Sequence, residues 1–143
     1  MQFEEKLLKA WLEMSACIRG NRVLKGLTFN EIMVCNFLSQ KEMPMTATEL
    51  CEKTHLLKSQ INKLLTGMEK KHLIIRQRSA ADKRKVHILI NQDYFDDYLN
   101  EHERVIQILS QMKKEMGDDN IELLTNLMHE AVVIFQKQTV QGD

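Results

Sequence analysis

The sequence predicts a mainly α-helical fold that contains one small β-hairpin. Two observations support this fold class. Glycine and proline are scarce, with 5 and 1 in 143 residues, and apolar residues recur mostly at helical spacing. Two short β-rich stretches that flank a polar turn are the exception. At this length we expect a single domain that spans residues 1–143.

The first part of the chain predicts three helices. Apolar residues recur at helical spacing over 3–18, and a second helix is expected to begin at Thr28, because 28–31 fits a capping box. A second capping box over 46–49 predicts a short third helix that ends near Lys53.

The middle of the chain predicts a helix-turn-helix followed by a hairpin. A fourth helix, roughly 58–71, follows the third after a tight turn over 54–57, and this arrangement is typical of a helix-turn-helix. Stretches rich in β-branched residues over 73–78 and 86–90 flank a polar tip and predict a two-stranded wing. A winged helix-turn-helix is therefore expected over about 28–91.

The last part of the chain is expected to form two long helices with a break at Gly117. Apolar residues follow alternating steps of four and three over 98–116, and the same spacing returns over 121–135. The helices within 1–20 and 92–138 have wide apolar faces. We expect them to be dimerisation helices, buried against a second copy of the chain.

Basic residues are concentrated in one window of the sequence. Nine of the twenty lysines and arginines lie within 58–85, where only Glu69 and Asp82 oppose them. The window carries +7 while the formal net charge of the protein is zero, so the other residues sum to −7. A cationic module on an acidic body is typical of proteins that bind phosphate backbones, and a solvated basic face is the other interpretation.

The types of polar residue in this window favour DNA. Lysine reaches phosphates or guanine, glutamine and asparagine bind adenine edges, and serine or threonine binds either. An arginine at the hairpin tip is suited to a narrow minor groove. The predicted DNA-binding residues are Lys58, Ser59, Gln60, Asn62, Lys63 and Thr66 on the fourth helix, and Lys83, Arg84 and Lys85 at the tip.

Several short motifs occur in a set order along the chain: Gly26-Leu27-Thr28, Thr48-Glu49-Leu50, the run from Glu69 to Ile74, and Asp82-Lys83-Arg84. Together they resemble the MarR family of winged helix-turn-helix transcriptional regulators, over nearly the whole chain. The resemblance implies a homodimeric, ligand-responsive regulator, in our interpretation a repressor, that binds a pseudo-palindromic operator. It implies that Arg84 enters the minor groove and that Asp82 orders the wing.

One position departs from the family pattern. His72 stands where the family usually ends its recognition helix with glycine, which adopts positive φ at low cost. Histidine is among the residues that tolerate this conformation, so we expect the fold to accept His72.

Aromatic and sulfur-containing residues suggest two kinds of regulation. Trp11 and Met14, with Tyr94 and Tyr98, are candidates to line a pocket for a small aromatic effector, and ordinary core packing is the alternative. Cys17 lies in the first helix, where some relatives carry a peroxide-sensing thiol. A thiol-switched regulator is therefore an alternative function, although plain burial of Cys17 is the simpler interpretation.

Other classes of function receive less support. No catalytic motif or metal-ligand spacing is present, so we expect neither enzymatic activity nor a metal or cofactor. No apolar run approaches the roughly 18 residues that span a bilayer. Three cysteines without any CxxC spacing favour reduced thiols in a cytoplasmic protein. A winged-helix adaptor that binds an acidic protein instead of DNA is the competing interpretation.

Overall fold

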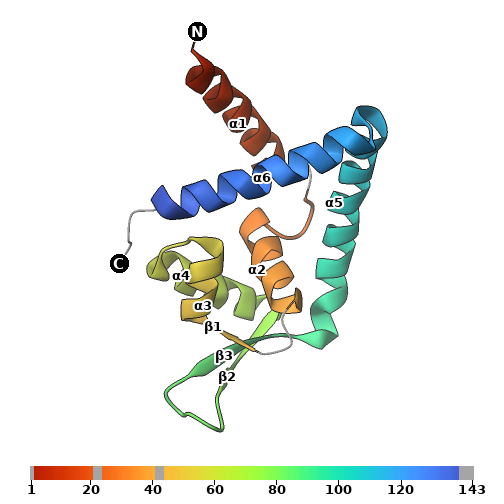
Figure 1. Ribbon diagram of the computed structural model, residues 1–143. Coiled ribbons are helices and arrows are strands. Elements are labelled where there is room, and N and C mark those ends of the chain that lie inside the picture. The colour runs from red at the N-terminus through yellow and green to blue at the C-terminus, as the bar shows by residue number, and fades with distance from the viewer. Residues whose placement is uncertain (1, 21–23, 41–43, 139–143) are drawn as a thin grey trace. The chain divides into compact units, whose positions relative to one another are not determined.

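The computed structural model describes residues 2–20, 24–40 and 44–138 (Figure 1). The chain divides into two compact units, Met1–Arg104 and Val105–Asp143, and the boundary falls within α5. The described elements are α1 (Phe3–Arg19), α2 (Phe29–Gln40), β1 (Met45–Thr46), α3 (Ala47–Thr54), α4 (Lys58–Lys70), β2 (Ile74–Arg78), β3 (Val86–Ile90), the 3-10 helix η1 (Gln92–Tyr94), α5 (Phe95–Met116) and α6 (Asp118–Gln138).

Capping residues determine where two helices of the first unit begin. At the start of α2 the Thr28 N–H donates to Oε1 of Glu31 at 2.8 Å, and the Glu31 N–H donates to Oγ1 of Thr28 at 3.2 Å. At the start of α3 the Glu49 N–H donates to Oγ1 of Thr46 at 3.2 Å. Both predicted helix starts are therefore confirmed, because these side chains satisfy backbone groups that have no partner inside the helix.

The sheet of the first unit has three strands in the order β1-β3-β2. β2 and β3 pair antiparallel, with Ile74 opposite Ile90 and Arg78 opposite Val86. In Figure 1 the hairpin that they form extends away from α3 and α4. β1, which lies on the other edge of β3, was not predicted, because two residues are too short to show strand alternation.

One hydrophobic core joins α2, α3, α4 and the sheet. Its fully buried side chains come from all of these elements and include Val34, Cys35, Met45, Leu50, Ile61, Leu65, Met68, Ile74 and Ile88. Three of them, Ile61, Leu65 and Met68, form the inner side of α4. Their burial fixes which side of α4 faces away from the core.

The end of α4 is closed by a Schellman motif. The His72 N–H donates to the Glu69 carbonyl at 3.0 Å, and the Leu73 N–H donates to the Met68 carbonyl at 2.9 Å. His72 adopts φ 64°, so the fold accepts histidine at this position, as expected. The ring of His72 also stacks on Tyr94, with 5.3 Å between centroids.

The start of α5 is tied to the segment that precedes α2. Glu101 is buried, and its Oε1 accepts a hydrogen bond from the Gly26 N–H at 2.9 Å. The Lys25 N–H donates to both carboxylate oxygens of Glu101, and Arg104 pairs with Oε1 at 3.2 Å. These contacts hold the entry and the exit of the winged helix-turn-helix together.

The terminal helices contrast with this core. None of the described residues of α1 or α6 is buried, although both helices carry many apolar side chains. The break between α5 and α6 falls at Gly117, as predicted, where φ is 92°. Among the described residues, no helix combines the length and the apolar character needed to cross a membrane.

Candidate nucleic-acid interface

The outer side of α4 carries the predicted recognition residues. Because the apolar side of the helix is buried, the polar and cationic side chains are left exposed. The exposed residues on this side are Lys58, Ser59, Gln60, Asn62, Lys63 and Thr66. Lysine, hydroxyl and amide groups on one exposed helix can form hydrogen bonds with both phosphates and base edges.

Gln60 also supports the first turn of α4. Its Oε1 accepts a hydrogen bond from the Leu57 N–H at 2.8 Å and so satisfies a backbone donor at the helix start. A bidentate contact with adenine uses both the oxygen and the nitrogen of a glutamine amide. In the free protein the oxygen of Gln60 already has a backbone partner.

Arg76 connects the wing to α4, and it was not among the residues predicted from the sequence. Its Nη2 donates to the Asn62 carbonyl at 3.3 Å and to Oγ1 of Thr66 at 3.2 Å. Its Nε lies 3.9 Å from Oε1 of Glu69. The only signal in the sequence is position: Arg76 is two residues after buried Ile74, so both side chains point to the same face of the strand.

The wing tip is ordered by Asp82. Oδ1 of Asp82 accepts hydrogen bonds from the backbone N–H of Arg84 at 3.1 Å and from its Nε at 3.3 Å. The Lys85 N–H donates to the Asp82 carbonyl at 3.0 Å and closes the turn, while Arg78 donates to the Lys83 carbonyl. The Arg84 side chain remains 91% exposed. The tip therefore presents a guanidinium on a turn that side-chain hydrogen bonds hold in shape.

Electrostatics reinforce this turn at neutral pH. The backbone N–H of Arg84, and then its side chain, lower the pKa of Asp82 below its ordinary value. A lowered folded-state pKa means that the stabilisation is present above the unfolded pKa near 4 and is lost as the pH falls through the lowered value. The contribution of the Asp82 carboxylate to the wing turn is therefore present at neutral pH.

The four candidate effector residues make different contacts. Tyr98 is buried, and its hydroxyl accepts from Nδ2 of Asn36 at 3.1 Å and lies 3.4 Å from Nδ1 of His102. Tyr94 stacks on His72. Trp11 and Met14 are exposed on α1. A shared effector pocket for these residues stays a prediction.

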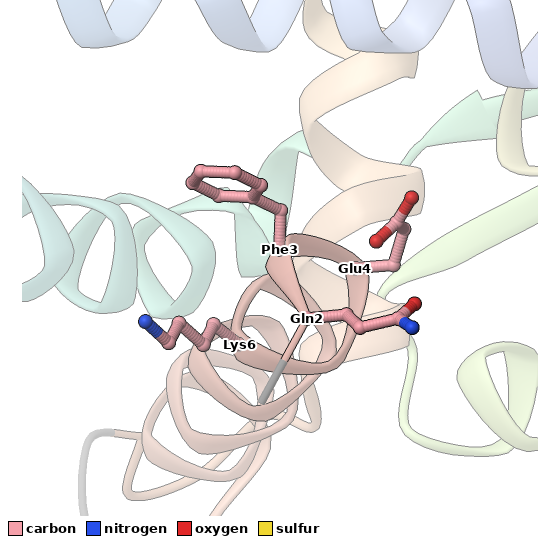
Figure 2. Close-up of a pocket in the computed structure, with 4 residues that line it drawn as sticks. All are labelled: Gln2, Phe3, Glu4 and Lys6. Carbon is pink, nitrogen blue, oxygen red and sulfur yellow. The ribbon is translucent and has the colours of Figure 1, made fainter.

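A surface depression of about 290 Å³ lies at the start of α1. Figure 2 shows the four side chains that line it, Gln2, Phe3, Glu4 and Lys6. They are the N-cap residue and three residues from the start of α1, and Phe3 is 88% exposed. None of them belongs to the predicted effector pocket, and we assign no ligand to this depression.

The cysteines occupy three different environments. Cys17 is exposed, so the prediction that it is buried is wrong; among the described residues of α1, none is buried. Cys35 is buried, and burial, followed by the charge of Glu31, raises the pKa of its thiol to about 12. Cys51 is half-buried against the core. Among the described residues, no three His, Cys, Asp or Glu residues are placed to hold a metal ion.

Solved structures with the same fold are transcriptional regulators. AbsC, a MarR family regulator from Streptomyces coelicolor, matches with a TM-score of 0.79 at 17% identity, over 96% of this chain and 97% of its own. PcaV from the same organism, in complex with its natural ligand, has a TM-score of 0.75 at 14% identity over 92% of each chain. The repressor CouR, bound to a 23-mer DNA duplex, has a TM-score of 0.75 at 18% identity over 92% of each chain. The predicted winged-helix fold is confirmed.

Sequence comparison identifies the family. No curated protein matches the chain. Residues 22–97, slightly more than half of the chain, match the family described as transcriptional regulator SarA/Rot. The resemblance to MarR family regulators holds for the fold, which the solved structures share. The chain belongs to the SarA/Rot family of transcriptional regulators.

Proposed function

We propose that this regulator represses transcription by binding a pseudo-palindromic DNA operator as a homodimer, and that a small aromatic effector changes its affinity for DNA. One observation carries the proposal: the exposed side of α4 and the ordered tip around Arg84 belong to one winged unit, linked by Arg76. In this mode α4 enters the major groove and Arg84 enters the adjacent minor groove.

The terminal helices support the homodimer. Apolar side chains that are about half exposed or more recur along α1 and α6. Exposed apolar surface of this extent marks a protein interface, and a symmetric dimer buries the same surface twice. Two recognition helices related by a two-fold axis would bind half-sites about 34–36 Å apart.

The effector is supported by the fold relatives. PcaV, with the same fold, was solved with its natural ligand. In this chain Trp11, Met14, Tyr94 and Tyr98 are the proposed contacts with an aromatic effector, and the aromatic rings of such residues suit flat apolar ligands. Since the target is DNA, we place the protein in the cytoplasm.

The first experiment tests sequence-specific binding. The full-length protein is mixed with fragments of the host genome at physiological salt, and the retained fragments are sequenced. We expect a small set of retained fragments with a two-fold symmetric motif. Equal retention of all fragments would contradict the proposal and favour the protein adaptor.

The second experiment tests the wing. Arg84→Ala should weaken binding to retained and unretained fragments alike, and should lower the slope of log K against log salt by about 0.9 for each lost phosphate contact. Lys114→Ala is the matched control, because it removes one exposed cation from α5 outside the basic window. Equal slopes for the two variants would remove Arg84 from the interface.

The recognition helix is tested at the level of base preference. Asn62→Ala should relax preference at particular base pairs, at a cost of about 1–3 kcal/mol for the retained motif. Ser59→Ala provides a second position on the same exposed side.

Cys17→Ser addresses the thiol switch, because a variant that still releases DNA on oxidation excludes this thiol as the sensor.

A further inference from the structure

We propose that Glu31 and Lys71 are positioning residues for DNA recognition, which hold the C-terminal end of α4 against α2 without contacting DNA. This inference rests on the proposed DNA binding through α4. It adds a pair of residues outside the exposed side of the recognition helix.

The geometry of the pair is bidentate. Nζ of Lys71 donates to Oε1 of Glu31 at 3.0 Å and to Oε2 at 2.9 Å. Oε1 also accepts from the Thr28 N–H at 2.8 Å, so the carboxylate is held by its own helix start. The Glu31 side chain is 4% exposed and the Lys71 side chain 49%. An ion pair that is buried on one side is screened less by salt than a surface pair.

The hydrogen bonds of the Glu31–Lys71 pair restrict the position of α4 in a way that apolar contacts do not. Ile61, Leu65 and Met68 attach α4 to the core through apolar contacts. Burial of apolar surface is non-directional, so it sets which side faces inward more strongly than it sets the position along the helix axis. A bidentate hydrogen-bonded pair has a narrow range of distance and angle. The pair therefore holds the end of α4 against Glu31, whose carboxylate is held in turn by the Thr28 N–H.

The location of Lys71 extends this effect to the wing. Lys71 directly follows α4, and the left-handed His72 and the buried Leu73 come next, before β2 begins. Displacement of Lys71 would shift both the end of the recognition helix and the start of the wing. The pair thus sets the relative placement of the two elements that are proposed to enter adjacent grooves.

The competing role for Lys71 is direct contact with a phosphate. The two roles predict different salt dependence. A phosphate contact adds about 0.9 to the slope of log K against log salt for each protomer, whereas a positioning residue leaves the slope unchanged and alters sequence preference.

The test uses Lys71→Met, with Lys70→Met as the matched control. Lys70 is the neighbouring residue on α4 and is exposed. The probes are a fragment retained by the wild-type protein and an unretained fragment of equal length. We expect Lys71→Met to lower the affinity ratio of the two fragments at least fivefold with an unchanged salt slope. Lys70→Met removes an exposed cation at the neighbouring position and should keep the ratio.

Two further variants separate positioning from folding. Glu31→Gln retains an oxygen for the Thr28 N–H but removes the charge, and Lys71→Arg retains the cation. Binding is measured below the thermal transition of each variant. We expect Glu31→Gln to lower the affinity ratio and Lys71→Arg to keep it near the wild-type value. The double variant Glu31→Gln/Lys71→Met should be no worse than Lys71→Met, because the two changes remove one interaction.

Each outcome has a definite meaning. A wild-type ratio in both Lys71→Met and Glu31→Gln, or a salt slope that falls by about 0.9 for each protomer in Lys71→Met, would overturn the inference. If Lys71→Met does not fold, the ratio of Glu31→Gln relative to Lys71→Arg decides in the same way. A wild-type protein that distinguishes no fragments would instead overturn the proposed function.

Discussion

The winged part of the first unit and the terminal helices use their apolar residues in opposite ways. From α2 to β3 a cluster of apolar side chains, among them Leu50, Ile61 and Leu65, is fully buried within one chain. In α1 and α6 no described residue is buried, and Phe135 and Ile134 remain more than half exposed. The winged region thus completes its core within one chain, whereas the described residues of α1 and α6 leave apolar side chains exposed.

This difference predicts which changes act on folding and which act on assembly. Core substitutions cost stability in proportion to the apolar contacts and the cavity that they leave. Substitutions on the exposed apolar faces of α1 and α6 should leave the free energy of unfolding of a single chain nearly unchanged and act instead on the dissociation constant of the proposed dimer.

The largest expected effect is on the winged core. Leu65→Ala should lower the free energy of unfolding by about 2–5 kcal/mol, because Leu65 is fully buried. Leu127→Ala makes the same change at a half-exposed position of α6. It should lower the free energy of unfolding far less, when unfolding is measured at protein concentrations below the dissociation constant of the proposed dimer. Chemical denaturation followed by circular dichroism measures both. Similar losses of unfolding free energy in the two variants would contradict the inference that only the winged region has its core within a single chain.

The next effect concerns assembly. Leu127→Lys together with Ile134→Lys places two charges on one stripe of α6 and should raise the dimer dissociation constant about a hundredfold or more, equivalent to about 2.7 kcal/mol. Sedimentation equilibrium measures this constant. Asn126→Lys, which adds a cation at an exposed polar position of α6, is the control. A monomeric wild-type protein, or an unchanged constant in the double variant, would contradict the proposed dimer.

A smaller effect sharpens the description of the winged core through its buried thiol. The pKa of Cys35 is raised to about 12, so the folded state keeps the proton while the unfolded state loses it near pH 9. The stability that this difference provides is fully present below pH 9 and is lost as the pH rises, by about 1.4 kcal/mol per pH unit. In denaturation at pH 8, 9 and 10, Cys35→Ala should show a flatter decline than the wild type.

The smallest effect concerns the end of α4. His72→Gly should be more stable than His72→Ala by about 1 kcal/mol, because glycine adopts the left-handed conformation without the penalty that a Cβ brings. Both variants lose the stack on Tyr94, so the difference isolates the backbone. Thermal denaturation measures it, and equal midpoints would show that the conformation relaxes.

Local patterns in the sequence predicted most of the fold. The capping boxes at Thr28 and Thr46, the apolar side of α4 and the β-rich stretches of the wing all depend on neighbours within a few residues. β1 was not predicted, because its strand conformation depends on pairing with β3, which lies far along the chain. Burial of Cys17 was predicted from its helical, largely apolar sequence context, and such a context does not reveal whether the chain itself covers the side chain.

The candidate site was predictable only in part, for the same reason. The exposed residues of α4 follow from the helical period once its buried side is known. Arg76 contacts Thr66, and Lys71 contacts Glu31, across separations of 10 and 40 residues. No periodic pattern links such positions, because the fold brings them together after the local elements form.

The carboxylate of Glu101 links the two ends of the winged helix-turn-helix through hydrogen bonds. It binds the N–H groups of Lys25 and Gly26 across separations of 76 and 75 residues, so this contact forms only when a long loop has closed. The amide protons of these two residues lie in a connecting segment, yet they exchange with solvent only after their hydrogen bonds to Glu101 have broken. Hydrogen exchange at Lys25 and Gly26 is therefore linked to cooperative opening of the unit rather than to fraying of a loop.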